Sequence, residues 1–85
     1  MDTDAEQRRM RWASRRGMLE LDLMLGPFVD RVWSELSERE RQVYHQLMEC
    51  EDQQLYGWLM NRGLPEEAEL RALVERISSF RRSLR

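Results

Sequence analysis

The chain has 85 residues, which fits one small domain over residues 1–85 and leaves little room for both a packed core and an enclosed substrate cavity. This length favours a binding or adaptor role over an enzyme. The formal net charge is −2, and the acidic residues of the second half disfavour broad nucleic-acid binding.

Several kinds of site are excluded by the residues that the chain lacks. His45 is the only histidine and Cys50 the only cysteine, so no metal-ligand set, no nucleophile with a histidine base and no internal disulfide are expected. The four glycines are dispersed and form no phosphate loop. We therefore predict no catalytic residues, no metal and no tightly bound cofactor, and we expect Cys50 to be a core residue.

The expected location follows from similar exclusions. No apolar stretch approaches the roughly 18–20 residues of a membrane span, and the N-terminus is polar and acidic, unlike a signal peptide. We therefore predict a cytoplasmic protein that does not insert directly into a membrane.

The apolar residues recur with helical spacing almost throughout, which predicts an all-α fold, a compact bundle of about five short helices. The first helix is expected over residues 4–14, with Gly17 taking the left-handed conformation that commonly follows a helix. A second helical segment begins near Met18 and is interrupted by Gly26 and Pro27. A kink or two abutting helices are expected there, because proline lacks an amide donor and clashes with the preceding turn.

The remaining helices are predicted from their ends. Ser37 and Glu40 match a capping box, so a third helix should start there. Asp52 is expected to cap a short fourth helix that ends at residues 61–63. Pro65 is expected to open a last helix, whose C-terminal end carries arginines that suit the helix dipole, namely Arg81, Arg82 and Arg85.

Two further expectations concern packing within the bundle. Gly57 inside the fourth helix is best explained by a close helix crossing near Trp58. Trp33 and Trp58 are expected in the core, whereas Trp12 is equally compatible with the core and with a partner surface.

The run from Trp12 to Asp22 brings arginines, a glycine and two carboxylates together. Arginine can grip carboxylates or carbonyls, glycine permits close approach of another chain, and Glu20 can accept hydrogen bonds. A simple corner between two helices would explain Gly17 and Glu20 equally well, but it leaves the density of arginines unexplained.

The chain resembles the FAD assembly factors of succinate dehydrogenase, the SdhE family. The resemblance is carried by two motifs and covers nearly the whole chain: Arg9-x-x-Trp12-x-x-x-Arg16-Gly17-x-x-Glu20-Leu21-Asp22 and Asp52-x-x-Leu55-Tyr56-x-Trp58-Leu59. It implies a five-helix protein that binds the flavoprotein subunit of succinate dehydrogenase, and often that of fumarate reductase. Such a protein promotes covalent attachment of FAD to a histidine of that subunit.

The resemblance also implies a division of roles. The flavin and its target histidine belong to the client, so FAD is the client's cofactor. By analogy, Arg16, Gly17 and Glu20 face the flavoprotein, and Arg9 and Asp22 match adjoining positions.

One alternative comes from another class of protein. Short helices joined by tight turns are also typical of small DNA-binding or transcription-associated modules. The net negative charge argues against this alternative.

Overall fold

The computed structural model describes residues 3–83, so Arg85 lies outside the described residues. This part of the chain contains five α-helices and no strand, which confirms the all-α prediction. The helices are α1 (Thr3–Ala13), α2 (Leu19–Val32), α3 (Glu38–Met48), α4 (Asp52–Leu59) and α5 (Ala68–Ser83), with a 3-10 turn, η1 (Trp33–Glu35), directly after α2.

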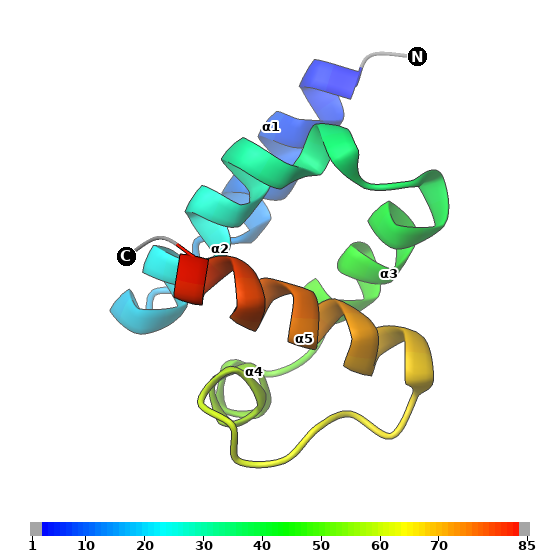
Figure 1. Ribbon diagram of the computed structural model, residues 1–85. Coiled ribbons are helices and arrows are strands. Elements are labelled where there is room, and N and C mark those ends of the chain that lie inside the picture. Colours follow the sequence, from blue (N-terminus) through cyan, green and yellow to red (C-terminus); the bar gives the residue numbers. More distant parts are fainter. Residues whose placement is uncertain (1–2, 84–85) are drawn as a thin grey trace.

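Helix α5 crosses the molecule and holds the bundle together (Figure 1). It contacts α2, α3 and α4, while α1 packs along α2. The Cα radius of gyration is 11.9 Å, the value expected for a compact chain of this length.

The core is rich in aromatic contacts between helices. The ring of Phe28 stacks on that of Tyr44 with centroids 6.1 Å apart, and it meets Phe80 edge-on at 5.6 Å. Trp33 is fully buried and lies edge-on to Tyr44, which confirms its predicted place in the core. Trp58 is half-buried and packs against the hydrophobic core from outside, so its predicted place within the core is wrong.

Helix α2 runs unbroken through Pro27 from Leu19 to Val32, so the expectation of two abutting helices is wrong. The carbonyl that loses its usual partner to Pro27 is that of Leu23, an exposed residue. Water can therefore replace the missing helical hydrogen bond. A Cβ on Gly26, next to Pro27, would lie 2.7 Å from the guanidinium carbon of Arg11, which is the end of a flexible side chain and could move aside.

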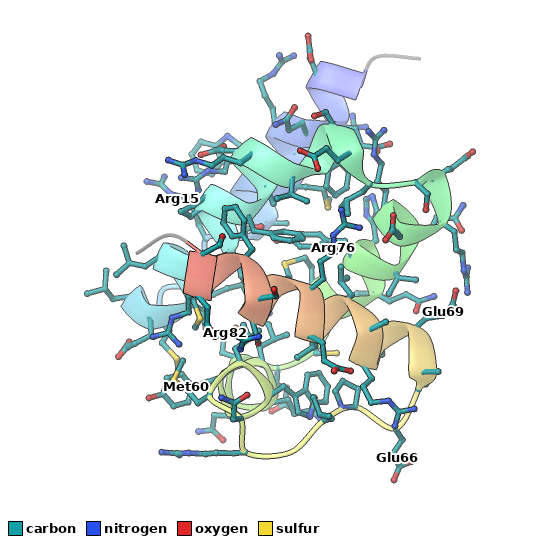
Figure 2. All side chains as sticks on the ribbon, in the orientation of Figure 1. Arg15, Met60, Glu66, Glu69, Arg76 and Arg82 are labelled. Atoms are coloured by element: carbon teal, nitrogen blue, oxygen red, sulfur yellow. The ribbon has the colours of Figure 1, made fainter. Side chains whose placement is uncertain are left out.

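The capping box predicted for the third helix is present. The Ser37 side chain accepts the Glu40 amide at 3.0 Å, and the Glu40 carboxylate accepts the Ser37 amide at 2.8 Å. Two ion pairs then tie α3 to α5, Arg39 with Glu69 and Arg76 with Glu40. Figure 2 shows Glu69 and Arg76 on α5.

The predicted cap of the fourth helix is wrong. The N-cap of α4 is Glu51, and Asp52 is the first helical residue. The Asp52 carboxylate is instead engaged by Arg16, which is 36 residues earlier in the chain. The Asp52 side chain therefore pairs with Arg16, which is distant in sequence, instead of capping the helix.

Helix α4 ends at Leu59, just before the stop predicted at residues 61–63. Asn61 adopts the left-handed conformation at φ 62°, and the amides of Asn61 and Arg62 bond back to the carbonyls of Trp58 and Gly57. This is the Schellman arrangement. No atom lies within 4 Å of a Cβ placed on Gly57, so the predicted close helix crossing there is wrong.

Helix α5 begins at Ala68, three residues after Pro65, so the prediction that proline opens this helix is wrong. Pro65 is buried in the segment that leads from α4 to α5. Its restricted φ suits an extended backbone as well as a first helical turn, and here its ring joins the packed interior.

Candidate functional site

The site predicted from the Trp12–Asp22 run is a corner between α1 and α2, which we call the corner loop, residues 14–18. Helix α1 ends at Ala13, and Gly17 has φ 82°, the left-handed conformation that glycine favours. Met18 is the N-cap of α2 with extended backbone and no side-chain cap. The corner loop therefore turns the chain at an exposed glycine.

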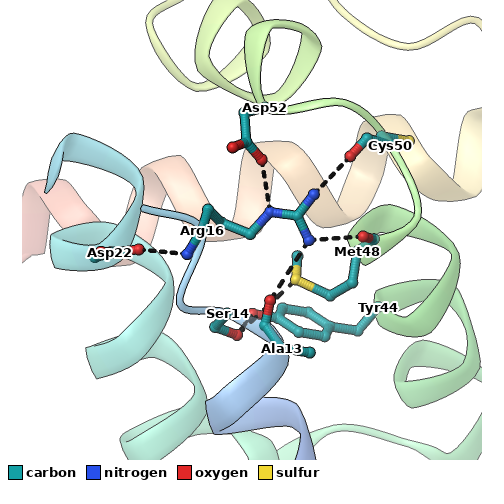
Figure 3. Close-up of polar contacts among 8 residues, drawn as sticks. All are labelled: Ala13, Ser14, Arg16, Asp22, Tyr44, Met48, Cys50 and Asp52. Atoms are coloured by element: carbon teal, nitrogen blue, oxygen red, sulfur yellow. Dashed lines mark hydrogen bonds and ion pairs between the residues drawn. The ribbon is translucent and has the colours of Figure 1, made fainter. Parts of the chain in front are cut away.

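Arg16 lies inside this corner and points into the protein (Figure 3). Its Nε donates to the carboxylate of Asp52 at 2.7 Å, and its terminal nitrogens donate to the carbonyls of Met48 at 2.7 Å and Cys50 at 2.8 Å. A longer bond of 3.4 Å reaches the carbonyl of Ala13. The guanidinium thus joins the corner loop to the junction between α3 and α4.

Asp22 holds the same residue from the other side. Its carboxylate accepts the backbone amide of Arg16 at 2.7 Å, and Asp22 is half-buried on the first turns of α2. A carboxylate near a helix N-terminus is also favoured by the helix dipole. Asp22 therefore links the corner loop to α2.

The outer side of the corner is open. Gly17 and Glu20 are exposed, and nothing lies within 4 Å of a Cβ placed on Gly17. Leu19 and Leu23 are 67% and 63% exposed, and residues four apart share one face of a helix. We call Gly17, Leu19, Glu20 and Leu23 the corner face, an apolar surface that also carries one carboxylate.

Two predicted residues lie on α1 near the corner loop. Arg9 is exposed. Trp12 is 69% exposed, and the guanidinium of Arg15 lies over its ring at 5.2 Å from the centroid. Of the two options that the sequence left open, the structure therefore places Trp12 on the surface rather than in the core.

A buried polar contact lies behind the corner and was not predicted. Ser14 is fully buried, and its hydroxyl donates to the Met10 carbonyl at 2.7 Å and pairs with the Tyr44 hydroxyl at 2.6 Å. Burial raises the pKa of Tyr44 well above its usual value, so this phenol stays neutral. Ser14 is the last residue of the predicted first helix, but nothing in the sequence indicated a partner thirty residues away.

The chemistry available at the surface is limited. In residues 3–83, no group of three or more histidine, cysteine, aspartate or glutamate side chains is placed to hold a metal ion. Cys50 is half-buried against the core, and burial raises the pKa of its thiol, which disfavours the reactive thiolate. The helices of this described part are all too short or too polar to cross a membrane.

Comparison with known proteins agrees with the motifs. A family model described as "Flavinator of succinate dehydrogenase" matches residues 8–81. The FAD assembly factor SdhE of Pseudomonas aeruginosa is 48% identical over 77 residues, which cover 91% of this chain and 92% of that protein. The protein of the same name from Yersinia pseudotuberculosis is 45% identical over 71 residues, covering 84% and 81% respectively.

Both the match across residues 8–81 and the identity to these relatives extend well beyond the corner loop. They include the junction of α3 and α4 that Arg16 contacts. The chain therefore belongs to the family of flavinators of succinate dehydrogenase.

Proposed function

We propose that this chain binds the flavoprotein subunit of succinate dehydrogenase through the corner face and promotes covalent attachment of FAD to that subunit. Family membership supports the function and confirms the predicted class, an assembly factor rather than an enzyme. The same membership favours this function over the DNA-binding alternative.

The observation that supports the proposed binding surface is that the corner at Gly17 is open and exposed. A chain approaching Gly17 meets no Cβ, and it finds two exposed leucines and the Glu20 carboxylate beside it. Apolar side chains supply contact area, and a carboxylate can accept hydrogen bonds that set the orientation of the partner. We expect Arg9 to contribute at the edge, while Arg16 and Asp22 support the corner from within.

The mechanism we propose is a shift in the client's conformations. A binding partner favours one conformation only by the difference in its affinity for the two states. This chain would bind best to the flavoprotein conformation in which the flavin and its target histidine are aligned, and would thereby raise its population. FAD is in this view the client's cofactor, and we propose that this chain holds no cofactor tightly.

The test is co-expression with the succinate dehydrogenase flavoprotein in a host that lacks its own assembly factor. Covalent flavin is measured by fluorescence of the flavoprotein in a denaturing gel. We expect a strong flavin band with the wild-type chain and its loss with Gly17→Arg. Equal flavin incorporation with and without the chain would refute the proposed function.

The chain offers a matched control for Gly17→Arg. Gly63 is also exposed, has φ 112° and has nothing within 4 Å of an added Cβ. Gly63→Arg therefore imposes at least as much backbone strain as Gly17→Arg, because φ 112° lies further from the left-handed region that other residues adopt, and Gly63 is not part of the corner face. It should retain flavin incorporation, and loss with both variants would mean that strain, not the surface, is responsible.

Glu20→Ala has its own control in Glu38→Ala. Both glutamates are exposed and lie in the first turn of a helix, so their effects on helix stability should be similar. Only Glu20→Ala should reduce flavin incorporation. The same assay with the fumarate reductase flavoprotein tests our further proposal that this subunit is also a client.

Two remaining proposals concern where the chain acts and which class of molecule it does not bind. We propose that it works in the cytoplasm and binds no nucleic acid. A measurement of DNA binding against salt concentration checks the second point, because a nucleic-acid-binding protein shows a steep fall in affinity as salt rises.

A further inference from the structure

The Arg16 side chain connects the corner loop to the junction of α3 and α4 and does not present free donors at the surface. We call Arg16 with its hydrogen-bond partners the Arg16 brace. The guanidinium makes four hydrogen bonds, to Asp52 and to the carbonyls of Met48, Cys50 and Ala13. Only 16% of the Arg16 side chain is exposed. An arginine that presents its donors to a partner would instead keep most of them free on the surface.

The acceptors of this brace explain why the position requires arginine. Met48 is the last residue of α3 and Cys50 lies directly after the C-cap Glu49, so both carbonyls lie where a helix leaves acceptors without intrahelical partners. The positive guanidinium satisfies these carbonyls and complements the negative end of the helix dipole. Asp52, at the start of α4, supplies the opposite charge, so Arg16 bridges two helix ends at once.

The brace sets the geometry of the residue immediately before Gly17. Asp22 holds the backbone amide of Arg16 at 2.7 Å, and Asp52 holds its Nε at 2.7 Å. The chain leaving Arg16 is thus fixed both at the backbone and at the end of its side chain. Two carboxylates therefore hold the residue that directly precedes Gly17.

We infer that Asp52 is a positioning residue for the corner face and that it acts through Arg16. Arg16 orders the corner loop from inside and does not offer its guanidinium to the flavoprotein. Asp22 has the corresponding role on α2. This inference rests on the proposed function. It assigns binding to Gly17 and Glu20 and assigns preorganisation to Arg16, Asp22 and Asp52. A preorganised loop binds more tightly because its ordering entropy is already lost before the partner arrives.

The experiment measures the affinity of the full chain for the purified flavoprotein subunit. Asp52→Ala should weaken binding by at least about tenfold, the effect expected when a charge-assisted hydrogen bond that orders a binding loop is lost. Glu69→Ala is the matched control. It removes a carboxylate that accepts from the Nε of Arg39 at 2.8 Å on a different face, and it should leave affinity unchanged.

A second readout separates positioning from general destabilisation. In Asp52→Ala, backbone amides of residues 15–20 should exchange with solvent faster, while amides in α5 keep their protection. Thermal unfolding of both variants checks that they are folded at the assay temperature. If Asp52→Ala does not fold, Asp52→Asn replaces it, because asparagine keeps the size of the side chain but removes its charge.

The alternative to positioning is that Arg16 contacts the flavoprotein directly, and it predicts a different result. If Arg16 swings out to grip the client, releasing it from Asp52 should leave affinity unchanged or raise it, and that outcome overturns the inference. Positioning also predicts that Asp52→Ala adds nothing to Arg16→Ala in the double variant. Failure of the wild-type chain to bind the flavoprotein would instead refute the proposed function, so the two failures are distinguishable.

Discussion

Two tryptophans of this chain lie in opposite surroundings. Trp33 is fully buried between Tyr44 and the guanidinium of Arg41, which also donates to the Trp33 carbonyl. Trp12 is 69% exposed, with only Arg15 over its ring. The same residue type therefore contributes to the core in one place and to the surface in the other.

We expect Trp33→Ala to lower the free energy of unfolding by about 3–5 kcal/mol, because it leaves a large cavity in the core. Trp12→Ala should change the free energy by about 0.5 kcal/mol or less, as for other surface substitutions. Urea unfolding followed by far-UV circular dichroism measures both. A similar loss in the two variants would contradict the surface position of Trp12.

At the scale of elements, the start of α3 depends on one carboxylate with two partners. Glu40 accepts the amide of Ser37 and a hydrogen bond from Arg76 on α5 at 2.7 Å. The Ser37 amide is the main reason that the pKa of Glu40 lies below its usual value of 4.5. The same side chain thus caps one helix and connects it to another.

This lowered pKa predicts a loss of stability in acid. The contribution of ionised Glu40 is complete above pH 4.5 and disappears as the pH falls through the lower pKa of the folded state. Unfolding free energies measured well above and well below pH 4.5 should differ more for wild type than for Glu40→Gln. An identical pH dependence in both proteins would exclude Glu40 as a source of the acid sensitivity.

At the scale of the whole molecule, α5 closes the bundle. It contacts α2, α3 and α4, and it buries Leu73, Val74 and Ile77. Burial of each such side chain contributes about 1.5–3 kcal/mol, and their sum is comparable with the whole stability of a small domain.

A chain truncated before Ala68 should therefore not fold. We expect it to lose its near-UV circular dichroism signal and its slow amide exchange. Ile77→Val is the conservative counterpart and should remain folded, with a loss of about 0.5–1.5 kcal/mol. A cooperative unfolding transition in the truncated chain would contradict the role assigned to α5.

The site was predicted only in part. Gly17 and Glu20 could be found from residue types and family motif, and both lie on the exposed corner. The exposure of Leu19 and Leu23 was not foreseen, because apolar residues in a helical pattern are normally assigned to the core. The inward direction of Arg16 was also not visible, since its acceptors are thirty-two or more residues away, apart from Ala13.

The sequence by itself determined the helical class, the left-handed glycine at the first corner and the capping box of α3, because each depends on residues within about one helical turn. Only the tertiary structure decided that Asp52 pairs with Arg16 instead of capping α4, and that Pro65 is buried before α5 begins. Local backbone preferences are worth about 1 kcal/mol or less for most residues. A buried side chain or a charged partner brought close by packing outweighs them, and its position depends on how the helices assemble.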